Sequence, residues 1–298
     1  MSFKEGKHTE RKPSWLKIKL PSGEGYANVN RMVKKHGLHT ICSSGMCPNI
    51  AECWGNGTAT FMILGEVCTR ACRFCATTTG APTEINPNEP NRIAESVKIM
   101  GLNHCVITSV TRDDLPDGGA QHWHDTIKEV KKQNPRTKVE VLIPDFKGNT
   151  QQIDTVLKSN PDIVAHNLET VRRLTPSVRS RATYENSLKV IGYVAKNGYL
   201  SKSGIMVGLG ESFQEVVQVM DDLIEVGCKA ITIGQYLQPR GENVPVSEYV
   251  TPEVFEKYKA LAKQKGFKFV ESGPLVRSSY HAEESFKNDA PNLKLPNQ

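Results

Sequence analysis

Six of the eight cysteines fall within 34 consecutive residues, far more than uniform scatter over 298 residues would place there. Thiols gathered in this way in a reducing compartment indicate metal binding or catalysis rather than a disulfide framework. The other two, Cys105 and Cys228, stand in apolar stretches and are expected to be small core residues. The dense segment is therefore where we expect the chemistry, and it divides into two groups of three cysteines.

The second group has the spacing CxxxCxxC, and no further cysteine or histidine follows it at ligand distance. A structural zinc site needs four protein ligands, so three thiols make a poor one. A cubane iron–sulfur cluster held by three thiolates fits better, because its fourth iron is left open to a substrate or cofactor. We therefore expect a 4Fe–4S cluster on Cys68, Cys72 and Cys75, directly after a predicted strand.

The first group, Cys42, Cys47 and Cys53, has the irregular spacing CxxxxCxxxxxC on a segment with helix-breaking residues. Its interpretations are a zinc knuckle with His36 or His39 as the fourth ligand, a second cluster, or thiols that bind no metal. The neighbouring CxxxCxxC group favours the second cluster. The sequence thus predicts two clusters with different purposes.

The CxxxCxxC spacing, with the aromatic Phe74 before its last cysteine, resembles the radical S-adenosylmethionine (SAM) superfamily. Its members hold SAM on the open iron, and one electron from the reduced cluster cleaves it to a 5′-deoxyadenosyl radical. Four runs resemble the lipoyl synthase family within it: CSSGMCPNIAECW at 42–54, ATFMILGEVCTRACRFC at 59–75, HNLET at 166–170 and GPLVRSSY at 273–280. The cysteines and the RSSY tetrapeptide follow that family's pattern without departure.

This resemblance implies a sulfurtransferase that inserts two sulfur atoms, at C6 and C8, into an octanoyl chain on a lysine of a carrier protein. Unactivated carbon–hydrogen bonds resist polar chemistry, so the cofactor supplies a radical and the protein supplies position. Two SAM molecules are consumed per lipoyl group. The resemblance also implies that an auxiliary 4Fe–4S cluster on Cys42, Cys47 and Cys53 donates the sulfur, with Ser279 as its fourth ligand and Ser278 as the alternative.

The residues that contact SAM are less sharply marked, apart from Phe74 beside the cluster. Asn167 and Glu169 follow the carboxyl end of a predicted strand, where a carboxylate can accept hydrogen bonds from ribose hydroxyls, although both residue types also start helices. Arg181 is a candidate partner for the methionyl carboxylate, but among neighbouring arginines it is equally explained as surface charge. The acidic run at 113–117 is expected to be a helix-capping turn rather than a cation site.

The resemblance implies partners as well: octanoylated lipoyl domains of 2-oxoacid dehydrogenase E2 subunits and the glycine cleavage H protein, a flavodoxin or ferredoxin as electron donor, and an iron–sulfur carrier for cluster repair. Residues 1–35 carry a net charge of +6, equal to that of the whole chain. Such a run is most simply a solvated tail, and our hypothesis is that it steers an acidic carrier domain. No nucleic acid and no membrane are expected as partners.

Two interpretations from other classes compete with the enzyme. A zinc or iron–sulfur nucleic-acid-binding protein would use the basic arm on phosphates, but it leaves the alternation of strands and helices unexplained. An electron-transfer or cluster-assembly protein would hold fully ligated clusters. Within the radical SAM class, a methylthiotransferase or a biotin-synthase-like enzyme is the nearest alternative, and the three cysteines ahead of the radical motif argue against both.

The elements that must position these groups alternate along the chain. Apolar, β-rich runs predict strands at residues 60–64, 105–110, 139–143, 162–165, 204–207 and 230–233, and helix-period segments lie at 91–100, 123–132, 150–158, 184–196 and 213–226. Six β-then-α units without hairpin signals imply parallel strands and right-handed crossovers. We expect an α/β fold, an open or partial (β/α)6 barrel, with a doubly wound sheet as the alternative.

Length and composition set the outer limits. A chain of 298 residues with 38% hydrophobic residues, 23% charged residues and a mean hydropathy of −0.42 matches soluble globular proteins. No run approaches the roughly 20 apolar residues of a membrane helix, and the polar, basic N-terminus resembles no secretory signal, so we expect a cytoplasmic location. We divide the chain into an N-terminal extension (1–58), a barrel core (59–270) and a C-terminal tail (271–298).

Overall fold

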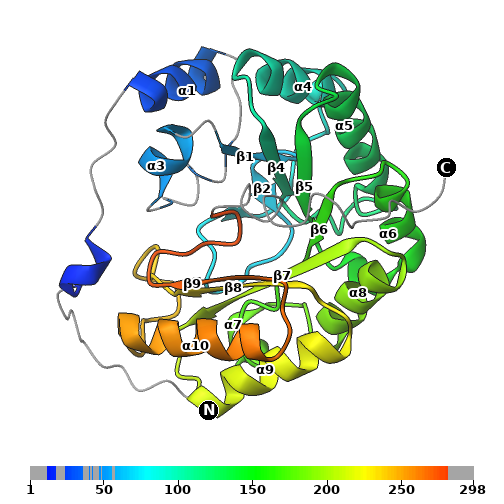
Figure 1. Ribbon diagram of the computed structural model, residues 1–298. Helices are drawn as coiled ribbons and strands as arrows, with labels where there is room; N and C mark the ends of the chain where they lie inside the picture. The colour runs from blue at the N-terminus through cyan, green and yellow to red at the C-terminus, as the bar shows by residue number, and fades with distance from the viewer. Residues whose placement is uncertain are drawn as a thin grey trace.

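The computed structural model describes residues 12–17, 24–35, 40, 42, 47, 49–55 and 58–280. Its elements follow one another in this order (Figure 1): η1 (Ser14–Leu16), α1 (Glu24–Lys35), α3 (Ile50–Gly55), β1 (Ala59–Ile63), β2 (Val67–Cys68), β3 (Thr78–Thr79), α4 (Glu89–Ile99), β4 (His104–Ser109), α5 (Ala120–Gln133), β5 (Lys138–Leu142), η2 (Phe146–Gly148), α6 (Thr150–Leu157), β6 (Ile163–Ala165), α7 (Thr175–Val178), α8 (Tyr184–Lys196), β7 (Leu200–Val207), α9 (Phe213–Glu225), β8 (Ala230–Gln235), α10 (Pro252–Gln264) and β9 (Phe269–Gly273). Within those residues, no helix combines the length and apolar character that crossing a bilayer requires.

Seven strands form one sheet in the order β1-β4-β5-β6-β7-β8-β9, and every pair in it is parallel. Within the described part of the chain, β1 and β9 each pair with one strand of this sheet, so hydrogen bonds do not close it into a full barrel. Figure 1 shows the strands curving round the centre of the molecule, with α4, α5, α6, α8, α9 and α10 outside them. The predicted partial barrel of parallel strands is confirmed.

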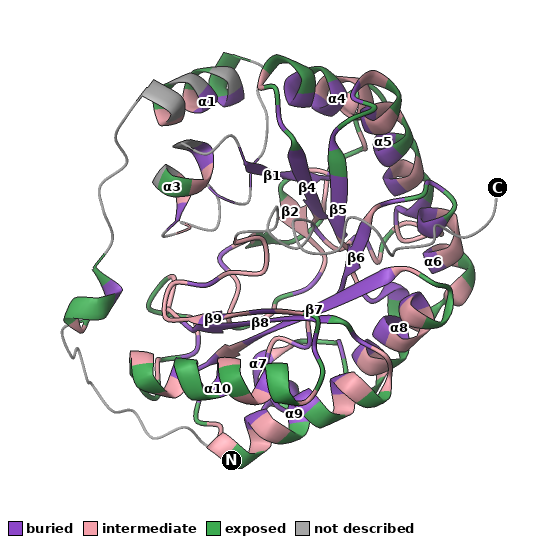
Figure 2. Cartoon of the chain, in the orientation of Figure 1, coloured by how far each residue is buried: buried purple, intermediate pink, exposed green. Residues whose placement is uncertain are grey.

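The strands carry nearly continuous apolar runs because both faces of the sheet are covered. Every residue of β1 and of β8 is buried. The outer helices instead carry one apolar stripe each: in α5 the buried residues Trp123, Ile127 and Val130 recur at intervals of three and four. Figure 2 shows this arrangement as buried strands inside helices whose outer faces are exposed. The sheet and the inner faces of the helices therefore form the core.

The helix α10 and the strand β9 are among the elements that the sequence did not predict. β9 pairs in parallel with β8, with Val270 opposite Ile231. Its residues alternate between half-buried and buried, as expected of a strand at the edge of a sheet. The strand runs across the proposed boundary at residue 270, so the first residues of the C-terminal tail belong to the sheet.

Buried charged side chains close the amino end of the barrel interior. Glu140 lies on the same face of β5 as Leu142, because side chains alternate along a strand, and Leu142 lines the cavity described below. Lys202 Nζ on β7 lies 2.8 Å from Glu140 Oε1, and His104 Nε2 on β4 lies 3.3 Å from Glu140 Oε2. Burial alone would raise the pKa of Glu140, but Lys202 and His104 hold it at about 2. These contacts of Glu140 with Lys202 and His104 therefore join β5 to β7 and β4 below the cavity.

Candidate active site

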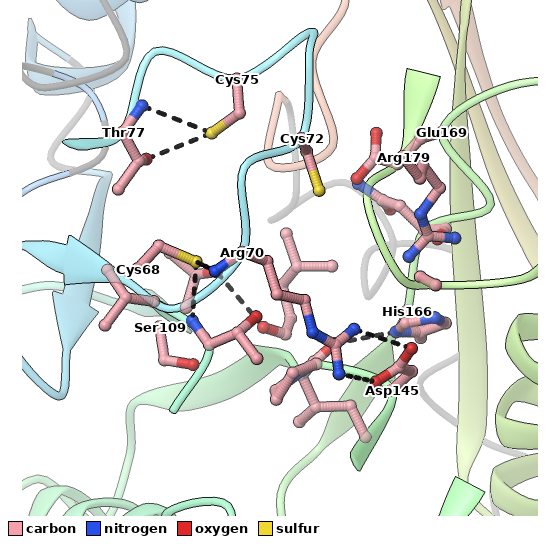
Figure 3. A pocket seen from close by; sticks show the side chains of 18 of the residues that line it. Cys68, Arg70, Cys72, Cys75, Thr77, Ser109, Asp145, His166, Glu169 and Arg179 are labelled. Carbon is pink, nitrogen blue, oxygen red and sulfur yellow. Dashed lines mark hydrogen bonds and ion pairs between the residues drawn. The ribbon is translucent and has the colours of Figure 1, made fainter. Parts of the chain in front are cut away.

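A cavity of about 300 Å³ opens at the carboxyl ends of the strands (Figure 3). Its lining comes from segments that are far apart in sequence: Cys68, Cys72, Phe74 and Cys75, residues 108–111 after β4, residues 142–145 after β5, residues 166–169 after β6, Arg179 and Ser278. Parallel strands end at one edge of the sheet, so the loops that follow them converge there. The structure thus brings the CxxxCxxC cysteines and the residues after β6 to one cavity, where both were predicted to act.

The loop that carries these three cysteines, residues 64–80, here called the cysteine loop, leaves β1 through a sharp turn. Leu64 and Gly65 both adopt left-handed backbone conformations, with φ of 69° and 95°. The two ends of the loop are then held together by β2 and β3, which pair in parallel as a separate two-stranded sheet. The turn therefore aims the thiols inward over the end of the sheet, and the strand pair fixes their loop.

Hydrogen-bond donors point at two of the three sulfurs of the cysteine loop. The backbone amides of Arg70 and Thr111 lie 3.4 Å and 3.3 Å from Cys68 Sγ, and the amide of Thr77 lies 3.4 Å from Cys75 Sγ. Burial raises the pKa of Cys75, and the hydrogen bonds from Thr77 oppose that rise. Such donors suit sulfur that carries negative charge. Among the described residues, no three His, Cys, Asp or Glu side chains converge closely enough to hold a single metal ion.

Arg70, between the first two cysteines of the loop, anchors it to the loops after β4 and β5. Its guanidinium donates to Asp113 Oδ2 and Oδ1 at 2.8 Å and 2.9 Å, and to Asp145 Oδ2 at 2.9 Å. Burial would raise the pKa of Asp145, but Arg70 lowers it to about 2. The predicted capping turn is present, because Asp117 accepts from the amides of Gly119 and residue 121 at the start of α5. The ion pair between Asp113 and Arg70 was not predicted from the sequence.

Asn167 and Glu169 lie at the cavity, and their position excludes helix capping. The first helix after β6 is α7, which begins only at Thr175. Glu169 has a left-handed backbone with φ of 70°, and its amide donates to the carbonyl of Gly204 at 3.0 Å. Burial raises the pKa of its carboxyl group. Asn167 Oδ1 is buried with no hydrogen-bond partner in the described structure, so a polar atom at the cavity wall awaits a donor.

Arg179 lines the cavity, whereas the sequence candidate Arg181 is exposed and outside the lining. Arg179 Nη1 donates to Ser187 Oγ at 2.7 Å, and Ser187 Oγ lies 3.0 Å from His166 Nε2. His166 Nδ1 lies 2.9 Å from the carbonyl of Ile143, which can only accept, so Nδ1 carries the proton and Nε2 accepts from Ser187. Burial, followed by the charge of Arg179, lowers the pKa of His166 to about 4.

Burial and the charge of Arg179 keep the imidazole neutral at pH 7, and the hydrogen bonds through Ser187 connect Arg179 to His166. Sequence reasoning noted the segment around His166 only for its resemblance and gave no role to Ser187. The signal was weak, because Ser187 lies on α8 and approaches the cavity only through the fold.

The first cysteine group, here called the auxiliary thiols (Cys42, Cys47 and Cys53), lies beside β1 and α3. Cys42 is buried and the other two are half-buried. The amide of Cys47 donates to the carbonyl of Cys42 at 3.0 Å. Burial raises the pKa of Cys42 and of Cys47. His36 and His39, the alternative zinc ligands, lie outside the described residues.

The tail that follows β9 crosses to the auxiliary thiols. Asn49 Nδ2 donates to the carbonyl of Leu275 at 2.6 Å, and the Tyr280 hydroxyl donates to Glu52 at 3.1 Å. The two serines between those anchors face different sites. Ser278 lines the cavity, whereas Ser279 Oγ accepts a hydrogen bond from Thr60 Oγ1 at 3.1 Å, next to Cys42.

Arg277 is a positively charged residue of the tail without a carboxylate partner among the described residues. Its guanidinium donates to the carbonyl of Val276 at 2.6 Å and is close enough to Cys47 for their charges to interact. Burial lowers the pKa of Arg277. Gly234 on β8 makes the room, because a Cβ there would lie 2.1 Å from the carbonyl of Val276.

Comparison with known proteins identifies the family to which this chain belongs. A family model described as the Radical SAM superfamily matches residues 62–223. The lipoyl synthase of Bacteroides thetaiotaomicron is 59% identical over 93% of this chain and 98% of that protein. The lipoyl synthase of Treponema denticola is 57% identical over 95% of this chain and 99% of that protein. This chain belongs to the lipoyl synthase family.

Solved structures agree with this family at the level of the fold. Streptococcus suis SuiB bound to S-adenosylmethionine matches 75% of this chain and 53% of its own, with a TM-score of 0.58 and 12% identity. The maturase HydG of Carboxydothermus hydrogenoformans matches 88% of this chain and 76% of its own, with a TM-score of 0.58 and 12% identity. As a lipoyl synthase, the chain is a radical SAM enzyme and a sulfurtransferase that uses a 4Fe–4S cluster and SAM. The nucleic-acid-binding and electron-transfer interpretations are set aside.

Proposed function

We propose that this lipoyl synthase divides its chemistry between two adjacent clusters. The three cysteines of the cysteine loop hold the cluster that binds SAM. The auxiliary thiols and Ser279 hold a second 4Fe–4S cluster, the source of two sulfur atoms for C6 and C8 of a protein-bound octanoyl-lysine. The observation that carries the proposal is the pair of neighbouring serines in the tail, Ser278 at the SAM cavity and Ser279 beside Cys42.

Unpartnered polar atoms support SAM as the occupant of the cavity. When bound and reduced, the cluster on the cysteine loop supplies the electron that cleaves SAM to a radical, which removes hydrogen from an unactivated carbon. Asn167 Oδ1 and Arg179 Nε are both buried without a partner in the described structure. We propose that Asn167 and Glu169 accept hydrogen bonds from the ligand, and that Arg179, in place of Arg181, pairs with its carboxylate.

Arg277 supports an anionic group at the auxiliary thiols. Burying a cation without a counter-ion is costly, so this guanidinium favours a negatively charged neighbour. A cluster held by three thiolates and an oxygen ligand carries such a charge. A serine oxygen is a harder ligand than a thiolate and is less well matched to iron. Ser279 as the fourth ligand therefore suits a cluster that must give up sulfur.

The partners of this site follow from the proposed reaction. The carriers are octanoylated E2 lipoyl domains and the H protein, a flavodoxin or ferredoxin delivers the electrons, and an iron–sulfur carrier restores the second cluster. The basic arm of residues 1–35, which we propose to steer the carrier, lies partly outside the described residues.

Anaerobic reconstitution tests the whole proposal. The full chain is expected to bind about eight irons, two cubane clusters. With dithionite, SAM and an octanoyl-lysyl peptide, mass spectrometry should detect 5′-deoxyadenosine and a peptide that has gained two sulfur atoms. Iron binding without deoxyadenosine would overturn the role of the cysteine loop. Deoxyadenosine without sulfur gain, from a chain holding eight irons, would overturn the role of the auxiliary thiols.

Replacing Ser187 with alanine is expected to weaken SAM binding about tenfold, because Arg179 Nη1 loses its shortest hydrogen bond and keeps only long ones to the carbonyls of Asn167 and Leu168, and His166 Nε2 is left buried without its donor. The dependence of deoxyadenosine formation on SAM concentration measures it: KM should rise while kcat changes less. Ser159→Ala is the matched control, since Ser159 is a buried, hydrogen-bonded serine after α6 and outside the cavity. An unchanged KM in Ser187→Ala would exclude this role of the hydrogen-bond chain.

A further inference from the structure

Thr60 is a buried polar side chain that the proposed function does not use. It lies on β1, and its side chain shares a face of the strand with Met62, which lines the SAM cavity. Its hydroxyl donates to Ser279 Oγ at 3.1 Å, across 219 residues of sequence. Its backbone and its side chain both hydrogen-bond to Cys42. One strand residue thus contacts two of the four groups that we assign to the auxiliary cluster.

Ser279 depends on this contact for its orientation. The tail around it is held by backbone and neighbouring groups: Asn49 binds the carbonyl of Leu275, and the amide of Tyr280 donates to the carbonyl of Arg277 at 3.0 Å. Those bonds fix the path of the chain and leave the serine side chain free to rotate about χ1. In the described structure, Thr60 is the group that hydrogen-bonds to the Ser279 hydroxyl.

The neighbouring Ser278 gives this contact a selective effect. Two serines in succession offer two oxygen atoms to the region between the sites, and Ser278 lines the SAM cavity. The Thr60 hydroxyl favours one of them, because its hydrogen bond reaches Ser279. A hydroxyl has a single proton, and Thr60 gives that proton to Ser279.

We propose that Thr60 is a positioning residue of the auxiliary site, which holds the Ser279 oxygen beside Cys42 and selects it over Ser278 as the fourth ligand. This inference rests on the proposed function, in which the auxiliary thiols and Ser279 bind a cluster. Thr60 itself does not bind iron. Its loss therefore loosens the oxygen ligand and leaves the three thiolates in place.

The test isolates the auxiliary site in the full chain by replacing Cys68, Cys72 and Cys75 with alanine. After anaerobic reconstitution, two properties are measured: the rate at which a chelator extracts iron, and the Mössbauer signature of an iron with an oxygen ligand. Thr60→Val, which keeps the shape and removes the hydroxyl, is expected to release iron about fivefold faster and to weaken that signature. Thr60→Ser, which restores the hydroxyl, should recover both.

Ser279→Ala shows how far loss of the oxygen ligand itself changes the extraction rate and the spectrum. The double variant, Thr60→Val with Ser279→Ala, shows whether the two residues act together. If Thr60 acts through Ser279, Thr60→Val should add nothing to the effect of Ser279→Ala. Independent, additive effects would overturn the inference, as would a Thr60→Val protein with the parent's extraction rate and spectrum. Thr232→Val, at another buried threonine of the sheet, controls for loss of a strand hydroxyl and is expected to match the parent.

The design separates this inference from the proposed function. A parent that binds a four-iron cluster whose spectrum responds to Ser279→Ala supports the proposed ligands whatever Thr60→Val does. A parent that binds no four-iron cluster, or one indifferent to Ser279→Ala, overturns the proposed ligands and the inference together. Chemical unfolding of each variant identifies any that fails to fold. If Thr60→Val does not fold, Thr60→Ser is compared with the parent instead. It should keep the parent's iron-extraction rate and spectrum if the hydroxyl, rather than the methyl group, positions Ser279.

Discussion

Replacing Cys42 with alanine is expected to abolish sulfur insertion while sparing the production of 5′-deoxyadenosine. Replacing Cys72 with alanine is expected to abolish both. Cys42 is buried beside Thr60, on the side of β1 where the tail delivers Ser279, whereas Cys72 lines the cavity. The two thiols therefore serve separate steps, and losing one ligand of three removes a cluster.

The measurement is a single anaerobic assay with two products, deoxyadenosine and sulfur-containing peptide, run beside an iron analysis. Each variant should lose about four irons and retain about four. Cys105→Ala is the matched control: this cysteine is fully buried on β4 and belongs to neither group, so both products should remain. If Cys42→Ala also stopped deoxyadenosine production, while retaining four irons, the division into two sites would be wrong.

Replacing Arg70 with methionine is expected to lower the free energy of unfolding by about 3–5 kcal/mol, because it leaves the carboxylates of Asp113 and Asp145 partly or fully buried without their cation. The cysteine loop should also lose its attachment to the loops after β4 and β5. Urea unfolding at pH 7 measures the first effect, and iron content measures the second. Arg70→Lys keeps the charge but not the planar fork, so an intermediate loss is expected.

The acid dependence of this effect follows from the lowered pKa of Asp145, about 2 in the folded chain. A depressed carboxyl pKa contributes stability above the unfolded value of about 3.9, and that contribution is lost as the pH falls towards 2. The difference between parent and Arg70→Met should therefore stay constant from pH 8 to pH 5 and shrink below pH 4. Arg136→Met, at an exposed arginine, should be neutral throughout. A difference independent of pH down to 2 would contradict the ion-pair explanation.

The sequence predicted the elements that are locally encoded. β1, β4 and β8 are uninterrupted buried runs, and α5 and α9 carry clear apolar stripes, so periodicity found them. β9 escaped because only alternate residues of this strand are buried, and its Glu271 and Ser272 resemble a polar tail. The helix before it, α10, lay beyond the last unit of the predicted series.

The part of the site whose residues lie close together in the sequence could be predicted from their spacing. The three cysteines of the CxxxCxxC group are recognisable from the sequence, because they lie within eight residues of one another. The choice between Arg179 and Arg181 depends on how the chain turns after α7, and two arginines separated by a single residue do not reveal that turn in the sequence. The link between Arg70 and Asp145 spans 75 residues and exists only because β1, β4 and β5 end side by side.

The sheet is not closed by hydrogen bonds between β1, its first strand, and β9, its last. The cysteine loop, which follows β1, and the tail, which follows β9, are therefore made at different times during synthesis. The cysteine loop and the strands β1 to β8 precede the tail in sequence and are translated first, whereas Arg277 and Ser279 follow β9. The proposed second cluster therefore acquires its last ligand only after the rest of the fold exists. We expect a chain shortened before Ser279 to keep the residues proposed to bind SAM and to lack the proposed oxygen ligand of the second cluster, so it should consume SAM without efficient sulfur insertion.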